Sequence, residues 1–414
     1  MHNASLIEIN CTAITSNVRL LRKIVGPECM LCPIVKADAY GLGAPRIART
    51  LLAAGAGIVA VYTPAQAAEL IRAAISAPIL VLMPVRDVDR VDDLYRGLIC
   101  GKLHLTVHDH DHLQNLIAIS ERFGAAMPVH LEIDTGMSRG GCSLEDAPAI
   151  LQRIAADRRL QLAGIFTHFA NAEDDIELTE SQLAAFDNLL EQNAAFIPKT
   201  CFIHAANSFA TLRAERYHKT MVRVGLAWAG YGMESLNGGD IITEGQHLQP
   251  AITWKSSIIQ IRRIAAGASV GYGSRWTAQR PSTIGLIPVG YADGYPAAAG
   301  RCADADHPGA SVGVLIDGRL YFAPVVGAVN MDQITIDLTD IADERIAVGT
   351  EVQLITPDAA APNHLPRLAR AGGTIPHEMM CRLNPRLKRV FRTEAAQLTP
   401  HRGSTPSAPI AAVG

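Results

Sequence analysis

The chain has 414 residues, 49% of them hydrophobic, and a formal net charge of −3 at pH 7. This length predicts two or three domains, and the near-neutral charge argues against a dedicated nucleic-acid binder. No apolar run reaches the roughly 18 residues that a membrane-spanning helix requires, so we predict no membrane span. Residues 1–5 lack a basic segment followed by an apolar one, so we expect no secretory signal and a cytoplasmic protein.

Short apolar runs recur through the first half of the chain, with segments of helical spacing between them. In one such segment Leu183, Phe186 and Leu190 fall on the same helical face. The apolar runs are residues 31–35, 58–62, 79–83, 103–107, 129–133, 162–166, 201–204 and 221–227. Alternating strands and helices predict an α/β fold with a parallel sheet. Eight such units match the (β/α)8 TIM barrel in number and length.

The second half of the chain has a different pattern. Runs rich in Ile, Val and Thr, separated by turn residues, predict a mostly β C-terminal domain. A final segment rich in Pro, Ser, Ala and Gly is typical of disorder. We therefore predict a TIM-barrel domain over residues 1–245, a β-rich domain over residues 246–395 and a disordered tail over residues 396–414.

Two groups of potential metal ligands are better explained by structure, and we predict no metal site. Cys29 and Cys32 form a C-x-x-C pair at the start of an apolar strand, with no second ligand pair, so we expect core packing. The second group is His104, His108, His110 and His112, interleaved with Asp109 and Asp111. It falls where a strand gives way to a helix, so we expect a solvated loop with Asp as the helix cap.

Polar residues follow the ends of the predicted strands, which is where a TIM barrel places its active site. They are Lys36 after the first strand, Arg139 after the fifth, His168 after the sixth, Asn207 and Ser208 after the seventh, and Arg223 with Gly225 and Leu226 at the eighth. Burial at such a strand end lowers the pKa of a lysine, and a neutral lysine can form a Schiff base with an aldehyde cofactor. Ser208 and Gly225 suit a phosphate, with Tyr40 as a third donor.

Several segments resemble those of one enzyme family. They are PIVKADAYGLG at residues 33–43, THFA at 167–170, VGYG at 270–273, PVGYADGY at 288–295 and VNMDQ at 329–333. Together they resemble the motifs of alanine racemases, pyridoxal phosphate enzymes built from a barrel and a β-domain. The resemblance covers about residues 5–395. It implies a homodimer that interconverts L- and D-alanine and supplies D-alanine for peptidoglycan.

The resemblance also implies roles for individual residues. Lys36, after the substrate displaces it from the cofactor, and Tyr272 of the partner subunit act as bases on opposite faces of the α-carbon, because racemisation removes and returns a proton on two faces. Arg223 donates a hydrogen bond to the pyridine nitrogen of the cofactor without protonating it, and His168 lies behind it. The phosphate contacts fall on Tyr40, Asn207, Ser208, Gly225 and Leu226. Arg139 contacts the cofactor and the substrate carboxylate, while Tyr291 and Met331 border the substrate.

Three positions depart from the family pattern. Glu132 stands where many members carry a lysine, and its carboxylate could orient Arg139. The stretch 382–386 has no tyrosine for the phosphate, and Asn330 replaces a frequent cysteine. These changes leave a serine or broader-specificity racemase as an alternative. A barrel-type pyridoxal phosphate decarboxylase and a non-catalytic pyridoxal phosphate carrier are further alternatives, disfavoured by Tyr272 and by the complete β-domain.

Overall fold

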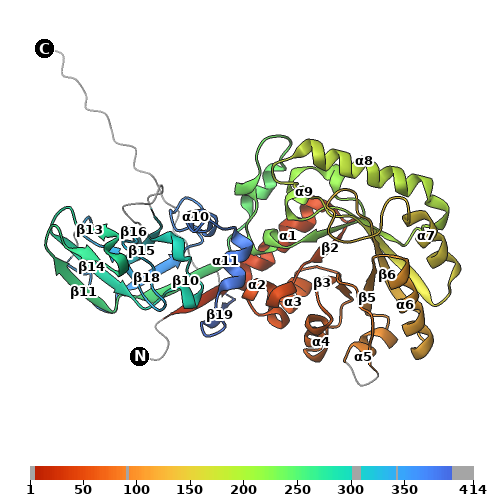
Figure 1. Ribbon diagram of the computed structural model, residues 1–414, viewed down its shortest axis with the longest axis horizontal. Helices are drawn as coiled ribbons and strands as arrows, with labels where there is room; N and C mark the ends of the chain where they lie inside the picture. Colours follow the sequence, from red (N-terminus) through yellow and green to blue (C-terminus); the bar gives the residue numbers. More distant parts are fainter. Residues whose placement is uncertain (1–4, 90–92, 301–308, 342–343, 394–414) are drawn as a thin grey trace, which may run out of the picture.

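A computed structural model describes residues 5–89, 93–300, 309–341 and 344–393. It has two lobes, one in which helices surround strands and one dominated by strands (Figure 1). Helix α11 (Pro376–Arg382) and strand β19 (Lys388–Arg392) lie between the lobes. The predicted disordered tail falls outside the described residues.

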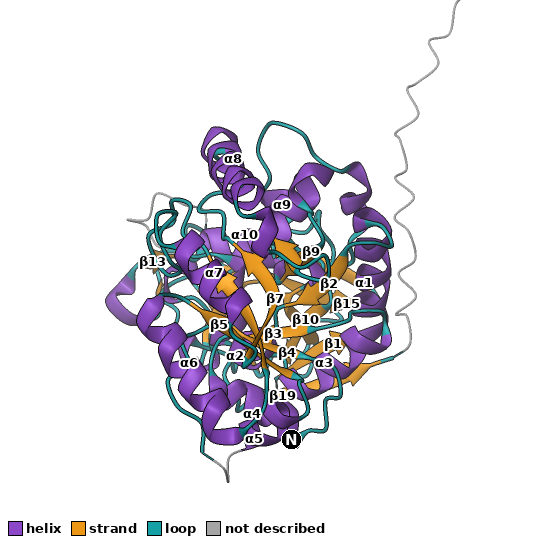
Figure 2. Cartoon of the chain, turned by 90° about the vertical axis from the view of Figure 1, so that its right-hand side faces the viewer, coloured by secondary structure: helices purple, strands orange, loops and turns teal. Residues whose placement is uncertain are grey.

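Eight parallel strands form the first lobe, gathered at its centre in Figure 2. They are β2 (Met30–Pro33), β3 (Val59–Val61), β4 (Ile79–Val81), β5 (Leu103–Val107), β6 (Met127–Glu132), β7 (Leu160–Phe166), β8 (Phe202–His204) and β9 (Met221–Val224). Strands β3 to β8 make one sheet in chain order, and β2 pairs with β9. A parallel bridge between Ile34 and Ala60 joins the two sheets on one side. On the other side the Thr220 N–H donates to the Ile203 carbonyl at 3.0 Å. The predicted barrel is confirmed, and each predicted strand overlaps an observed one.

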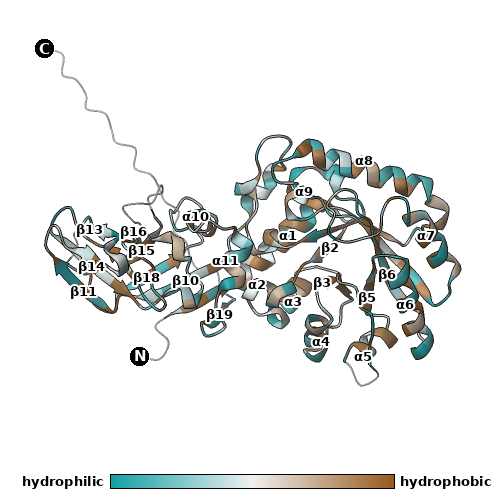
Figure 3. Cartoon of the chain, viewed as in Figure 1, coloured by the Kyte–Doolittle hydropathy of each residue, from teal (hydrophilic) through white to brown (hydrophobic). Residues whose placement is uncertain are grey.

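Helices connect the strands and cover the barrel. They are α1 (Cys11–Val25), α2 (Lys36–Gly41), α3 (Ala44–Ala53), α4 (Pro64–Arg72), α5 (Asp93–Ile99), α6 (His110–Phe123), α7 (Ala147–Ala156), α8 (Ile176–Gln192) and α9 (Ser208–Arg213). Helix α6 shows why these segments are helical: Asp109 caps its first turn, Leu113 and Leu116 are buried on one face, and Gly124 ends it at φ 63°. Figure 3 shows the same alternation of hydrophilic and hydrophobic positions along α8.

The histidine cluster beside α6 differs in part from its prediction. Asp109 is the helix cap, as predicted, and its carboxylate accepts the His112 N–H at 2.6 Å. However, His104, His108 and His112 are buried rather than solvated. The barrel interior encloses His104, and the imidazole Nε2 atoms of the other two bond to the carbonyls of Leu82 and Val85. The predicted core packing of Cys29 and Cys32 is confirmed, since both thiols are buried.

The second lobe contains one six-stranded sheet and two smaller ones. Its strands are β1 (Leu6–Asn10), β10 (Ile252–Ser257), β11 (Gln260–Ile264), β12 (Ser269–Val270), β13 (Trp276–Thr277), β14 (Ser282–Ile287), β15 (Ser311–Ile316), β16 (Arg319–Pro324), β17 (Ile334–Asp337), β18 (Glu351–Ile355) and β19. Helices α10 (Leu365–Ala371) and α11 follow β18. In the large sheet Leu6 of β1 lies between Lys255 of β10 and Lys388 of β19. The first strand of the chain therefore belongs to the β-rich sheet, although the predicted boundary grouped it with the barrel. Among the described helices, none has the length and apolar character of a membrane span.

Candidate active site

The candidate site lies at the C-terminal ends of the barrel strands, beginning with Lys36 after β2. Lys36 opens α2, a turn in which Ala37 to Tyr40 have φ between 51° and 57°. Left-handed backbone in four consecutive non-glycine residues is costly and needs support from its surroundings. Asp38 provides part of it, because its carboxylate accepts the Ala44 N–H at 2.6 Å. The turn directs Tyr40 into the protein, where its side chain is buried against Trp228.

The amine of Lys36 occupies a site that disfavours its charged form. Burial lowers its pKa, and the positive charges of Arg139 and Arg223 lower it further. A larger fraction of neutral amine follows, which is the nucleophilic form of lysine. This agrees with the depressed pKa that the strand-end position predicts.

Arg223 of β9 is the centre of a buried hydrogen-bond network. Its Nη1 lies 2.9 Å from His204 Nδ1, and its Nη2 lies 3.0 Å from His168 Nδ1. It also donates to the carbonyls of His204, Thr167 and Ala205. Guanidinium has only donors, so both imidazole Nδ1 atoms accept. Burial, with further contributions from the charges of Arg223, Arg139 and Lys36, lowers the pKa of His168 to about 3. His168 is therefore neutral and orients Arg223.

Two further histidines extend this network through the barrel interior. His204 Nε2 lies 3.0 Å from His130 Nδ1, and His130 Nε2 lies 3.0 Å from His104 Nδ1. Because His204 Nδ1 accepts from Arg223, each neutral ring in turn donates from Nε2 to the next. Sequence analysis gave no role to His130 or His204 and placed His104 in a loop. The signal that could have identified these residues is a histidine within an otherwise apolar predicted strand.

The predicted phosphate residues meet where β8 and β9 end. Ser208 Oγ accepts the N–H groups of Gly225 and Ala227 at 2.9 and 3.2 Å. Asn207 caps α9 by accepting the Ala210 N–H at 2.9 Å. A Cβ atom at position 225 would lie 2.2 Å from the Tyr40 hydroxyl oxygen, so only glycine fits there. Buried Leu226 follows and begins the 3₁₀ turn Leu226–Ala229.

Arg139 lies at the open side of the site, in the loop after β6. The Asp134 carboxylate shapes this loop by accepting the N–H groups of Gly136, Met137 and Ser138. A small cavity borders Arg139, His168 and Glu132. Glu132 Oε2 lies 3.1 Å from His108 Nδ1, and among the described residues no ion pair joins Glu132 to Arg139. The expected orienting contact between Glu132 and Arg139 is therefore not what the structure shows.

Helix α11 contributes a ring that sequence analysis missed. The His377 ring lies 5.8 Å from the Tyr40 ring and 6.4 Å from the Phe209 ring. Burial and the nearby charge of Lys36 lower the pKa of His377 to about 4. Burial raises the pKa of the Cys381 thiol, one helical turn later, and the nearby charge of Lys36 opposes this rise. The C-terminal region thus reaches the candidate site through α11 rather than through residues 382–386.

Three predicted residues lie in the other lobe and are exposed. Tyr272 is 78% exposed, Met331 55% and Tyr291 47%. Tyr272 lies in the connection between β12 and β13, and Figure 1 shows β13 at the end of the β-rich lobe remote from the barrel. The structure of one chain therefore brings Lys36, Tyr40, His168, Ser208, Arg223 and Gly225 together, but does not add Tyr272, Tyr291 or Met331 to them.

Comparison with known proteins agrees with this architecture. Residues 9–232 match the family model "Alanine racemase, N-terminal domain", and residues 251–391 match "Alanine racemase, C-terminal domain". The chain is 34% identical over 391 residues to alanine racemase of Synechocystis sp., covering 93% of this chain and 98% of that protein.

Solved structures give the same result. The alanine racemase of Streptomyces lavendulae superposes with a TM-score of 0.81 at 28% identity, covering 95% of this chain and 98% of that one. The alanine racemase of Bartonella henselae, solved with covalently bound pyridoxal phosphate, gives 0.76 at 27% identity, covering 94% and 99%. A parallel barrel carrying a half-buried lysine, joined to a β-rich lobe, defines the class of the protein. This chain belongs to the alanine racemase family.

Proposed function

We propose that the protein is a pyridoxal phosphate-dependent racemase that interconverts L- and D-alanine. The observation that carries this proposal is the position of Lys36, whose pKa is lowered by burial, at the end of β2 beside Arg223. Membership in the alanine racemase family supports alanine as the substrate. On the same family grounds we extend the proposal to the supply of D-alanine for peptidoglycan.

The residues present fit the cofactor. Lys36 offers an amine of lowered pKa to an aldehyde. Gly225 leaves the backbone bare beside the Tyr40 hydroxyl, which suits a phosphate group. Within the described residues the buried Arg223 has hydrogen-bond partners on Nη1 and Nη2 but none on Nε, so one donor remains for a ring nitrogen.

Pyridoxal phosphate, when bound, supplies an aldehyde carbon and an electron-withdrawing ring that acidifies the α-C–H bond of an attached amino acid. Arg223 would hold the ring nitrogen by a hydrogen bond and keep its own proton, because guanidinium stays charged at neutral pH even with its pKa lowered to about 10 by burial. Ser208, Gly225 and Tyr40 would hold the phosphate. Arg139 would attract the substrate carboxylate.

On one face of the substrate, Lys36 would take the α-proton as a neutral amine and would return a proton as ammonium. Returning a proton to the opposite face requires a second acid or base. We assign that role to Tyr272 of a partner subunit in a homodimer. The exposure of Tyr272, Tyr291 and Met331 supports this assignment, since all three large side chains are free to contact a second subunit.

The test is proton NMR of the purified holoenzyme with L-alanine in deuterated water. Loss of the α-proton signal, together with D-alanine on chiral chromatography, is the expected result. Parallel samples of L-serine and L-lysine measure specificity, and comparable exchange on either would replace the proposal with a broad-specificity racemase. Absence of exchange on all three, with the cofactor bound, would contradict racemisation.

A further inference from the structure

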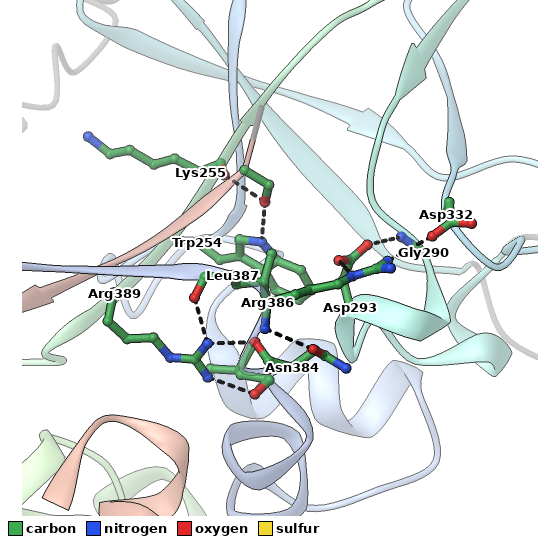
Figure 4. Close-up of polar contacts among 11 residues, drawn as sticks. Trp254, Lys255, Gly290, Asp293, Asp332, Asn384, Arg386, Leu387 and Arg389 are labelled. Carbon is green, nitrogen blue, oxygen red and sulfur yellow. Dashed lines mark hydrogen bonds and ion pairs between the residues drawn. The ribbon is translucent and has the colours of Figure 1, made fainter. Parts of the chain in front are cut away.

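Arg386 joins two loops of the β-rich lobe with one guanidinium group (Figure 4). Its Nε donates to Asp293 Oδ1 at 2.7 Å, and its Nη2 donates to Asp332 Oδ1 at 2.8 Å. Arg386 lies in the turn between α11 and β19, far along the chain from both aspartates. A planar guanidinium bonded to two carboxylates fixes the distance between the segments that carry them.

Each aspartate lies within two residues of a residue that the proposed function places at the substrate. Asp293 ends the 3₁₀ turn Tyr291–Asp293, and Asp332 follows Met331 directly. The two loops also share backbone hydrogen bonds, from the Tyr291 N–H to the Asn330 carbonyl and from the Ala292 N–H to the Met331 carbonyl, both at 3.0 Å. Arg386 therefore holds one unit made of both loops.

The burial of Asp293 distinguishes the Arg386–Asp293 pair from an ordinary surface ion pair, whereas Asp332, the second partner of Arg386, is exposed. Exposed pairs contribute little, because solvent screens them and both side chains lose freedom. Here Asp293 is buried, and its second oxygen accepts the Gly290 N–H at 3.0 Å. The Asn384 N–H also donates to the Asp293 carbonyl at 3.1 Å. Tyr291 and Met331 are exposed, so their positions depend on the anchored backbone.

The turn that carries Arg386 is itself anchored to the barrel site. Arg389 donates to the carbonyls of Leu383, Asn384 and Leu387 at 2.7, 2.5 and 2.7 Å. Its Nε donates to the Gly41 carbonyl at 3.1 Å, at the end of the Lys36 turn. A continuous set of hydrogen bonds thus connects the Lys36 turn of one chain to its own Tyr291 and Met331 loops.

We propose that Arg386 is a positioning residue that holds Tyr291 and Met331 at the partner subunit's site and thereby sets substrate affinity. This inference rests on the proposed function. Arg389 provides the anchor on the barrel side. Arg386 does not touch the reacting atoms, so its loss acts on KM more than on kcat.

Hybrid dimers test this proposal. When Lys36→Ala and Tyr272→Ala chains are mixed, each hybrid dimer has one complete site. That site takes Lys36 from the Tyr272→Ala chain, and it takes Tyr272, Tyr291 and Met331 from the Lys36→Ala chain. Arg386→Gln in the Lys36→Ala chain removes both charge-assisted bonds and should raise KM for alanine about tenfold, with kcat within about twofold. Arg386→Gln in the Tyr272→Ala chain should change neither KM nor kcat. Arg382→Gln, which removes only an exposed pair with Glu378, is the matched control.

A second measurement does not depend on activity. Hydrogen exchange in the Arg386→Gln holoenzyme should be faster at the amides of Tyr291 and Ala292, and unchanged in Arg382→Gln. Equal KM effects in both placements, or unchanged exchange at these amides, would overturn the positioning role. An inactive hybrid without Arg386 substitution would instead overturn the shared site, and exchange would still decide the role of Arg386.

Discussion

The barrel end and the β-rich lobe contribute predicted site residues in opposite physical states. At the barrel end Arg223, His168 and Ser208 have their hydrogen-bond partners within the same chain. In the lobe Tyr272 and Met331 are largely exposed. The barrel residues are preorganised by the fold of a single chain. The side chains of the β-rich lobe are exposed, and they acquire their proposed function only beside a second chain.

Lys36→Ala should have the largest effect. It removes the only amine that the proposal assigns to the cofactor and to one proton transfer, so alanine racemisation should fall by at least about 1,000-fold. Chiral chromatography of the product measures it. Lys23→Ala, a change in the last turn of α1, serves as control. Retention of more than a tenth of the activity would contradict the assigned role of Lys36.

Tyr272→Phe should reduce racemisation by about 100-fold while keeping the ring and removing the acidic hydroxyl. Because Tyr272 is assigned to the other subunit's site, mixing Lys36→Ala and Tyr272→Ala chains should restore activity that neither has alone. Size-exclusion chromatography of the mixture checks that dimers form. If dimers form and recover no activity, Tyr272 does not complete the partner's site.

Arg223→Met should destabilise the fold as well as the site. It leaves the Nδ1 atoms of His204 and His168 and several carbonyls without their donor, so the free energy of unfolding should fall by about 3 kcal/mol. Urea denaturation measures it. Arg216→Met is the control, because Arg216 is exposed and pairs with Glu180 and Asp240, and it should cost about 1 kcal/mol or less. If both variants lost the same free energy of unfolding, the buried Arg223 would stabilise the fold no more than the exposed Arg216.

Acidification should destabilise the barrel through its buried histidines. Burial lowers the pKa of His104 from 6.5 to about 4, and His168 is lowered to about 3. Since the folded pKa lies below the unfolded one, the unfolded chain binds protons first as pH falls. The stabilisation is therefore complete above about pH 6.5 and is lost towards pH 4 for His104 and towards pH 3 for His168, at up to about 1.4 kcal/mol per pH unit for each histidine. Urea titrations at pH 8, 6 and 5 measure the slope, which His104→Gln should reduce. A slope unaffected by His104→Gln would contradict the lowered pKa.

Local sequence patterns predicted most of the barrel and the lysine turn, because apolar runs and strand ends are visible without a structure. Contacts made across the barrel were not predictable in this way. The alignment of His204, His130 and His104 depends on how three strands lie beside one another, and His377 reaches Tyr40 only because α11 packs on the Lys36 turn. Arg386 was missed for the same reason, since its two aspartates lie more than fifty residues away.

The place of β1 has a consequence for how the protein is made. Its strand neighbours are β10, which follows the whole barrel, and β19, at the end of the described chain. During synthesis the first strand leaves the ribosome with neither neighbour available, and the barrel can form before either appears. The large sheet of the β-rich lobe is completed only when residues 388–392 emerge. Pairings between chain ends form slowly because a long loop must close first. The barrel is in effect an insertion within that sheet, and the sheet is finished last.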